Sequence, residues 1–369
     1  MAKYRSAVIG LGWMGLLYDL ADRMGVWHVD DVERPTPELD VHRTFHYHTM
    51  FTDRKKRPTS YSEALNDRPD VELVAAAERD KKRLAAFGQR YGVSALYTDA
   101  VEMLREERPD IVAIATNTKM RPELTLAAVE NGAKGIVTEK PMATRLEECD
   151  AIVKACAEAH VPICCGAIST SHPAFATAKK LIAKGAIGEV MSVDTVSDKN
   201  LSQHQNWSYF VDGTPQWVVG AGDSPSRESG SGEFRGQGFM VTDAGLVVQF
   251  RKGAPFVRIS GSEGEIRHDL PYGSWRWWQQ RCSGDTQASV EMPWPETQQS
   301  IVGMGAIFGL ADVIDCLEGR LDEPKNSGRR VARAIEVELG LKLSAAKLGE
   351  RIDLPLADRT LGLEYDWHR

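Results

Sequence analysis

The sequence lacks the features that mark membrane, secreted and nucleic-acid-binding proteins. It has no run of about 18 apolar residues, which excludes an ordinary transmembrane helix. Its first residues lead directly into an apolar segment and show no hydrophobic region typical of a signal peptide. Lys and Arg total 45 against 52 Asp and Glu, so the net charge of −7 argues against nucleic acid as a partner. We therefore expect a cytoplasmic protein that binds neither membrane nor nucleic acid.

Cysteine is scarce, and the six that occur form no C-x-x-C pair. This pattern argues against a disulfide framework, and we expect reduced thiols in the core. His42, His46 and His48 lie close together in the sequence. No single helix or strand would direct all three at one point, so we expect no metal site.

A glycine-rich turn near the N-terminus is the most informative feature that is present. The apolar run Ala7–Ile9 leads into three glycines at the spacing G-x-G-x-x-G. In a dinucleotide site the first glycine permits the turn, the second lets a pyrophosphate approach, and the third lets a helix pack closely. A glycine-rich turn in an ordinary α/β protein is the alternative. The residues we assign to cofactor binding here are Gly10, Gly12, Trp13, Met14 and Gly15.

The 369 residues suggest about two domains. Apolar strands alternate with helical segments over the first part of the chain, which is the pattern of a doubly wound parallel sheet. We place this domain at residues 1–142, with an inserted loop at about 21–57. The strands predicted after the first are Val71–Glu78, Ala95–Tyr97, Ile111–Thr116, Gly135–Pro141 and Val161–Ala167.

The remainder, residues 143–369, has more strand-like segments and fewer helices. It predicts an α+β domain with an open, mostly antiparallel sheet, used for substrate binding and oligomerisation. Its first helix and strand, within 144–167, and its C-terminal helices are expected to pack on or near the first domain. The strands predicted from the pattern are Glu189–Val196, Met240–Gln249, Phe256–Ile259 and Glu265–His268.

Two charged residues at strand ends, Glu78 and Lys140, are candidates for binding cofactor or substrate. Glu78 ends the second strand, where a carboxylate can accept hydrogen bonds from the adenosine ribose and disfavour a 2′-phosphate. This favours NAD over NADP, although Arg79 could offset the repulsion. Lys140, after Glu139, ends a buried strand, where a lysine can contact both cofactor and substrate. Surface residues at strand ends are the alternative for each.

These motifs resemble the glucose-fructose oxidoreductase and inositol dehydrogenase family, Gfo/Idh/MocA. The resemblance implies a Rossmann domain followed by a mixed sheet that forms dimer or tetramer contacts. It also implies NAD(P)-dependent oxidoreduction of a sugar, cyclitol or polyol, with Lys140 contacting substrate and cofactor, and a cofactor loop at Thr116 and Asn117. The matching segments are VIGLGWMG (Val8–Gly15), LVAAAERD (Leu73–Asp80), DIVAIAT (Asp110–Thr116), VTEKPMA (Val137–Ala143), AKKLIAKGAIGEV (Ala178–Val190) and ISGSEGEI (Ile259–Ile266).

The sequence departs from the family where an Asp-x-x-x-His pair is common. Counting back from Gln216–Gly220 places Asn206 and Phe210 at these positions, and neither side chain can accept a proton as a base. His204 and Tyr209 are the nearest candidates for that role, with Asp212 a further titratable residue. Structural or exposed roles are the alternatives. Asn206 and Asp212 remain candidates for substrate binding.

Four further positions could contact substrate. Arg121 stands where the family often has His, and it could hold an anionic group or simply be a surface charge. His172 could face the same site or cap a helix. Trp275 and Trp277 share one face of a strand and suit either contact with a sugar face or burial in an interface or the core.

We therefore predict an NAD-dependent dehydrogenase, with NADP possible, that acts on the CH–OH group of a carbohydrate, polyol or sugar acid and forms a homodimer or homotetramer. One alternative is an enzyme that retains NAD and uses transient oxidation for elimination, hydrolysis or transfer. The other is a non-catalytic protein that senses NAD or a sugar, which the missing Asp/His pair would suit.

Overall fold

A computed structural model describes residues 3–17, 59–166, 168–197, 201–223, 232–254, 256–269, 274–298 and 305–363. Its contacts divide the chain into two units. The first unit comprises 1–143, 148–171 and 302–328, and the second comprises 144–147, 172–301 and 329–369. The predicted inserted loop at 21–57, with His42, His46 and His48, lies outside the described residues.

The first unit is built on a parallel sheet with the strand order β3-β2-β1-β4-β5-β6. This is the order of a doubly wound nucleotide-binding fold, which confirms the predicted fold class. The strands carry short apolar runs that are buried on both faces, as parallel strands require. They are β1 (Tyr4–Ile9), β2 (Val71–Ala77), β3 (Ala95–Tyr97), β4 (Ile111–Ile114), β5 (Gly135–Thr138) and β6 (Ile163–Cys165).

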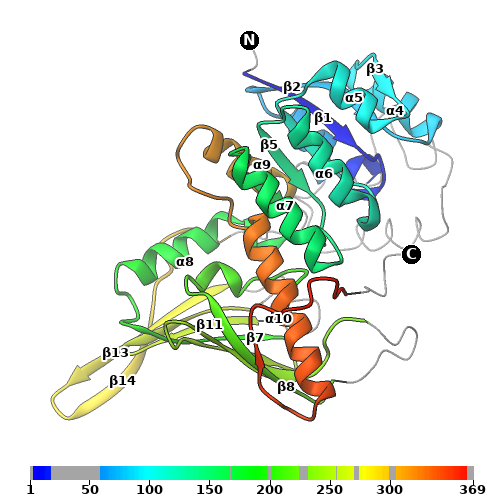
Figure 1. The fold of residues 1–369 in the computed structure, drawn as a ribbon. Helices are drawn as coiled ribbons and strands as arrows, with labels where there is room; N and C mark the ends of the chain where they lie inside the picture. The colour runs from blue at the N-terminus through cyan, green and yellow to red at the C-terminus, as the bar shows by residue number, and fades with distance from the viewer. Residues whose placement is uncertain are drawn as a thin grey trace. The chain divides into compact units, whose positions relative to one another are not determined.

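Helices connect these strands (Figure 1), and several begin at residues that cap them. The Asp80 carboxylate accepts hydrogen bonds from the Lys82 and Arg83 N–H groups, and Asp99 accepts one from Glu102. Each of these helices follows a strand, in line with the predicted alternation of strands and helical segments. The helices of this unit are α3 (Tyr61–Asn66), α4 (Lys81–Tyr91), α5 (Ala100–Glu107), α6 (Arg121–Glu130), α7 (Leu146–Glu158) and α9 (Gly305–Leu317).

Helix α9 comes from late in the sequence yet belongs to the first unit. It packs on β5, β6 and α3. Its apolar residues join the same buried cluster as β1. A Cβ added to Gly135 would lie 2.5 Å from Cγ1 of Val313, so this glycine makes room for the helix.

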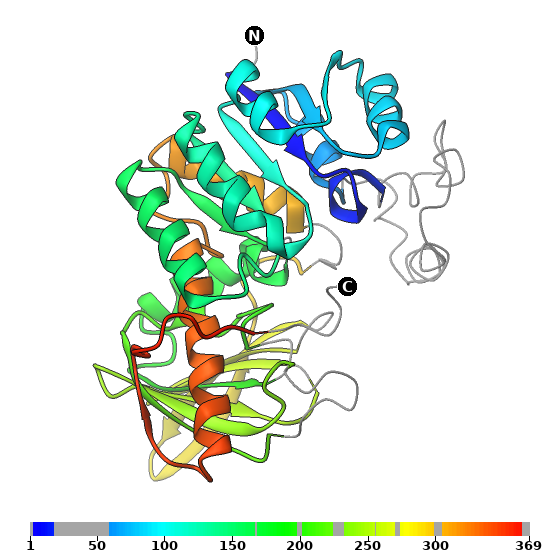
Figure 2. The same ribbon diagram turned by 45° about the vertical axis from the view of Figure 1, so that its right-hand side comes forward.

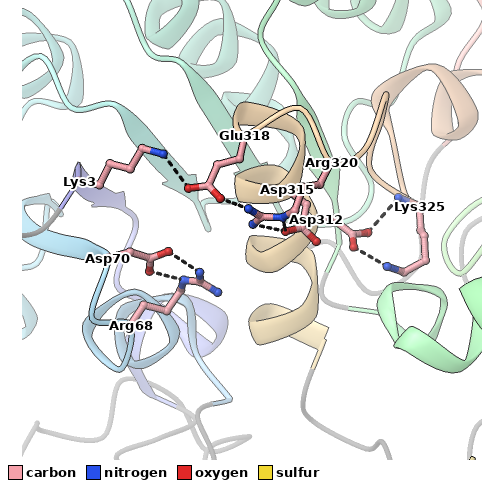
Figure 3. Close-up of polar contacts among 8 residues, drawn as sticks. All are labelled: Lys3, Arg68, Asp70, Asp312, Asp315, Glu318, Arg320 and Lys325. Carbon is pink, nitrogen blue, oxygen red and sulfur yellow. Dashed lines mark hydrogen bonds and ion pairs between the residues drawn. The ribbon is translucent and has the colours of Figure 1, made fainter.

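Ion pairs hold the C-terminal half of α9 and the loop that follows it (Figure 3). Lys3 Nζ lies 2.7 Å from a carboxylate oxygen of Glu318, which follows α9. Asp312 and Lys325 form a buried pair, and Asp312 also accepts the Lys325 N–H at 3.0 Å. Burial raises the pKa of Asp312, and the ammonium of Lys325 opposes that shift. The buried pair therefore closes the loop between α9 and the next helix.

The second unit is built on an open sheet of order β14-β13-β12-β11-β7-β10-β9-β8-β15. All neighbouring pairs are antiparallel except β7 with β10, which confirms the predicted mostly antiparallel sheet. Its strands are β7 (Val190–Val196), β8 (Pro215–Ala221), β9 (Gln237–Thr242), β10 (Val247–Arg251), β11 (Phe256–Gly261), β12 (Gly264–Asp269), β13 (Trp275–Ser283), β14 (Thr286–Met292) and β15 (Ile352–Asp353).

The prediction of one strand over Met240–Gln249 is wrong. The segment is a hairpin, in which β9 and β10 pair antiparallel and reverse direction through a turn at Gly245, with φ of +79°. This backbone conformation favours glycine. Apolar residues stand on both sides of the turn, at Met240–Val241 and Leu246–Val248, which made the segment resemble one strand.

Two helices belong to this sheet, α8 (Pro173–Ala183) and α10 (Gly328–Ala346). Figures 1 and 2 show α10 lying along one face of the sheet, while the β13–β14 hairpin projects from it. A Cβ added to Gly220 on β8 would lie 2.3 Å from the Leu341 carbonyl oxygen, so glycine permits the close approach of α10. Of the helices in the described segments, none combines the length and apolar content needed to cross a bilayer.

Candidate functional site

A cleft of about 400 Å³ lies at the carboxyl ends of the strands in the first unit. It spans the ends of β1 and β4, where the strand order reverses, which is the usual ligand position in such sheets. Six of the predicted cofactor residues line it, namely Gly10, Gly12, Glu78, Arg79, Thr116 and Asn117. Residues that the sequence did not single out also line it, among them Arg83, Thr98, Asp99, Val101 and Met120.

The three glycines of the turn have different surroundings. Gly10 has a φ of +87°, and an added Cβ would lie 3.0 Å from the Ala115 main chain. An added Cβ on Gly15 would lie 1.9 Å from the Gly10 carbonyl oxygen. On Gly12, by contrast, an added Cβ would meet nothing within 4 Å. The protein therefore requires Gly10 and Gly15 for its own packing, but leaves open space beside Gly12.

The turn continues into a short π-helical segment, Trp13–Leu17. Trp13 and Met14 are half-buried there, and the N–H groups of Leu16 and Leu17 both bond to the Gly12 carbonyl. Ser62 on α3 donates its hydroxyl to the Gly15 carbonyl. The turn is thus held in place by α3 as well as by its own backbone.

Glu78 joins the glycine turn to the start of α4. One carboxylate oxygen accepts the Leu11 N–H at 2.6 Å, and the other accepts the Asp80 N–H at 3.0 Å. Arg79 is exposed at the cleft, and Arg83 lies 3.5 Å from the Asp80 carboxylate. The negative charge of Glu78 is therefore fixed at the cleft by two main-chain hydrogen bonds.

Glu139 and Lys140 follow β5. Glu139 is buried and accepts hydrogen bonds from the Tyr61 hydroxyl at 2.9 Å and from the Lys140 N–H at 3.1 Å. Burial, with the nearby charge of Glu139, raises the pKa of Tyr61. Lys140 is half-buried and precedes Pro141 through a cis peptide bond.

Arg121 lies at the start of α6 and is only 5% exposed. Its guanidinium donates to the Thr116 carbonyl at 2.7 and 3.0 Å, to the Thr118 hydroxyl at 3.3 Å, and to the Pro141 carbonyl at 2.6 Å. Burial lowers the pKa of Arg121, and Glu139 opposes this. The described hydrogen bonds of Arg121 are therefore all with other groups of the protein. The sequence, in contrast, suggested that Arg121 could bind an anionic group of the substrate.

The remaining predicted residues lie in the second unit. Asn206 is buried, with its side-chain oxygen accepting the Thr195 hydroxyl at 3.0 Å. His172 is half-buried, and its Nδ1 accepts the Ala174 N–H at 3.1 Å as the cap of α8. His204 is half-buried, and Asp212 is exposed and pairs with Lys179 at 2.6 Å.

Tyr209 lies between two cations. Lys179 Nζ is 5.0 Å from the centre of its ring, and the Arg330 guanidinium carbon is 5.3 Å away. Its neighbour Phe210 packs against Phe175 in an aromatic cluster, with ring centres 5.9 Å apart. The position where the family commonly has His is thus filled by an apolar ring in a buried cluster.

Trp275 is 3% exposed and belongs to the same aromatic cluster, where it contacts Phe175, His268 and Trp294. This supports the core alternative for Trp275. Trp277 is half-buried, and its indole N–H donates to the Ala186 carbonyl. No group of three or more His, Cys, Asp or Glu side chains suited to a metal ion occurs in the described part of the chain.

The first-unit cleft fits a dinucleotide in two respects. The open space beside Gly12, at the start of a helical segment, is where a pyrophosphate would approach the main chain. Glu78 stands one strand away, where a ribose would lie. Residues 58–167 match the model of the Gfo/Idh/MocA oxidoreductase family, which is described as having an NAD-binding Rossmann fold. Over this segment the chain is similar to that family.

Two curated relatives are similar to this chain over about a third of its length. D-apiose dehydrogenase of Paraburkholderia graminis is 36% identical over 125 residues, covering 34% of this chain and 33% of the relative. The scyllo-inositol 2-dehydrogenase (NAD(+)) of Bacillus subtilis is 32% identical over 121 residues, covering 33% and 35%. The chain thus spans about a third of the length of these two relatives in the alignments.

The similarity of fold covers nearly all of the chain. An NAD-binding oxidoreductase from Klebsiella pneumoniae has a TM-score of 0.68 over 97% of this chain and 100% of that chain. The two sequences are 16% identical, so the comparison establishes a shared fold and no more.

Proposed function

We propose that this protein is an NAD-dependent oxidoreductase of the Gfo/Idh/MocA family that acts on the CH–OH group of a sugar, cyclitol or related polyol or sugar acid. The observation that carries the proposal is the cleft in which Gly12, Glu78 and Thr116 meet at the carboxyl ends of parallel strands. The relatives named as apiose and inositol dehydrogenases support the substrate class.

The residues of the first unit would hold the cofactor as follows. The main chain around Gly12 would bind the pyrophosphate, and Glu78 would accept from the adenosine ribose and disfavour a 2′-phosphate. The loop at Thr116 and Asn117 would contact the cofactor further along the cleft. Bound NAD would supply a hydride acceptor. NADP remains possible because Arg79 and Arg83 also line the cleft.

Lys140 would orient the reacting hydroxyl and help remove its proton. The second unit would supply the remaining proton-accepting group. Tyr209 and His204 are our candidates, since the structure buries Phe210 and Asn206. Tyr209 is the more sharply defined of the two, because the Lys179 ammonium and the Arg330 guanidinium lie near its ring and would attract an anionic substrate. His172 and Asp212 remain candidates for substrate contacts.

The test measures NAD binding and NADH formation separately. The wild-type protein is incubated with NAD or NADP and a panel of aldoses, polyols, cyclitols and sugar acids, with NADH followed by its absorbance. Lys140→Met should abolish turnover while NAD binding by calorimetry remains. Lys134→Met is the matched control, because Lys134 pairs with Asp110 on the protein surface and does not line the cleft.

The outcomes separate the candidate functions. NADH formation that disappears in Lys140→Met supports the dehydrogenase. Tightly held NAD with turnover but no net NADH release would favour an enzyme of elimination, hydrolysis or transfer. NAD binding with no redox change on any substrate would favour a sensor. Loss of turnover in Lys134→Met as well would contradict a specific role for Lys140.

We also propose that the protein is cytoplasmic and assembles as a homodimer or homotetramer through its mixed sheet. The resemblance to the family supports the assembly, and the six cysteines without C-x-x-C spacing support the cytoplasmic location. Sedimentation velocity tests the assembly, and a monomer across the measured concentrations would contradict it.

A further inference from the structure

Three polar side chains are almost fully buried behind Lys140. Tyr61 is 2% exposed, Arg121 is 5% exposed and Glu139 is 7% exposed. They come from α3, from α6 and from the residue after β5, so three elements meet at one point. Polar groups are buried at this density only when they are hydrogen-bonded, and each of these is.

Two of these side chains hold the main chain on either side of Lys140. Glu139 accepts the Lys140 N–H at 3.1 Å, and Arg121 donates to the Pro141 carbonyl at 2.6 Å. Tyr61 in turn donates to the Glu139 carboxylate at 2.9 Å, which fixes the orientation of that carboxylate. The backbone of Lys140 is therefore anchored from both directions by buried, charge-assisted hydrogen bonds.

Arg121 also joins Lys140 to the cleft. Its guanidinium makes two hydrogen bonds to the Thr116 carbonyl, and Thr116 lines the cleft. The same planar group thus spans the loop after β4 and the loop after β5. A lysine could not replace this arrangement, because its single ammonium lacks the fixed fork of donors.

We propose that Tyr61, Arg121 and Glu139 are positioning residues that set the place of Lys140 relative to the cleft, and that they govern turnover rather than cofactor affinity. This inference rests on the role of Lys140 in the proposed function. In this proposal Arg121 holds the main chain beside Lys140 and does not bind a substrate anion. A displacement of about 1 Å in a reacting group can cost about a hundredfold in rate.

The central test compares two tyrosines that make the same kind of bond. Tyr61→Phe removes the hydroxyl that binds Glu139. Tyr91→Phe is the matched control, because Tyr91 donates to the Glu63 carboxylate at 2.8 Å in the same unit but does not line the cleft. Arg121→Lys is the second variant, which keeps the charge but not the fork, and it keeps the test informative if Tyr61→Phe folds poorly.

Three quantities are measured on each folded variant. These are the dissociation constant of NAD by calorimetry, the kcat and KM for the substrate found above, and the acylation rate of the Lys140 amine by acetic anhydride, mapped by peptide mass. We expect Tyr61→Phe and Arg121→Lys to lower kcat about 10- to 100-fold with NAD affinity unchanged. The acylation rate of Lys140 should change in both variants and not in Tyr91→Phe.

The acylation rate separates the failure of this inference from the failure of the proposed function. An unchanged rate in Tyr61→Phe and Arg121→Lys overturns the positioning role, whatever the activity. A changed rate in a protein that oxidises no substrate supports the positioning role and contradicts the dehydrogenase. Equal losses of kcat in Tyr61→Phe and Tyr91→Phe would overturn the inference, because they would show a general effect on stability.

Discussion

Replacing Gly12 and Gly15 by alanine, one at a time, should separate ligand binding from folding. An added Cβ on Gly15 would lie 1.9 Å from the Gly10 carbonyl oxygen, which is far inside van der Waals contact. An added Cβ on Gly12 would meet no protein atom within 4 Å. The two variants add the same methyl group to the same turn, so any difference between them comes from the surroundings of each residue.

The two variants should change different properties: Gly15→Ala should lower the stability of the protein, and Gly12→Ala should weaken NAD binding. Gly15→Ala should cost about 3 kcal/mol of unfolding free energy, since the opposing atom is backbone and cannot rotate away. In a domain of this size that lowers the melting temperature by roughly 6–12 °C. Gly12→Ala should change stability by less than about 0.5 kcal/mol. It should weaken NAD binding about 10- to 100-fold, because loss of one charge-assisted hydrogen bond to the pyrophosphate costs about 1.5–3 kcal/mol.

The assay is thermal unfolding with and without NAD, together with calorimetric titration of NAD. Wild type should gain stability from NAD, and Gly12→Ala should lose that gain at an unchanged ligand-free melting temperature. If Gly12→Ala binds NAD as tightly as wild type, the turn does not hold the pyrophosphate. If Gly12→Ala instead unfolds as early as Gly15→Ala, the space beside Gly12 is needed by the protein itself.

Three further predictions concern charge and burial. Glu78→Gln removes the fixed negative charge of the cleft and should shift the ratio of NADP to NAD affinity about tenfold toward NADP, measured by titration with each nucleotide; an unchanged ratio would show that Glu78 does not discriminate. Lys325→Met leaves the buried Asp312 carboxylate without its partner and should cost about 3–5 kcal/mol in denaturant unfolding, much of which Asp312→Asn in the same protein should restore; a small cost for Lys325→Met alone would contradict this. Burial lowers the pKa of His268 from 6.5 to about 4, with His172 adding to the shift and Asp269 opposing it. Between these values the unfolded chain binds a proton that the folded state excludes, so stability should fall by about 3 kcal/mol as the pH drops from 6.5 to 4. His268→Phe should lack this part of the pH dependence, and an identical pH profile for the variant would rule the residue out.

The first unit was largely predictable from the sequence because its strands are short apolar runs separated by capped helices. Strand β3, Ala95–Tyr97, has the predicted bounds. The second unit was less predictable. Strand β14 carries the sequence TQASVEM and is exposed on both faces, so no buried apolar face marks it. It is a strand because β13 pairs with it along its whole length.

Some residues of the candidate site could likewise be predicted from the sequence, and others could not. The glycine turn, Glu78 and Thr116 stand at strand ends, and topology alone brings strand ends together. Arg83 and Val101 reach the cleft from helices, at positions that depend on how α4 and α5 begin. The contacts of Arg121 were beyond prediction, because an arginine at a helix start gives no sign that two loop carbonyls lie within its reach.

The return of α9 to the first unit has a consequence for biosynthesis. Leu310, Val313 and Ile314 share one apolar cluster with Val8 and Val137. A ribosome releases the N-terminal strands long before it makes these residues, and domains usually fold as they emerge. Here the nascent nucleotide-binding half must wait with an uncovered apolar surface until more than 300 amino acids have been polymerised, so chaperone engagement should last through most of translation.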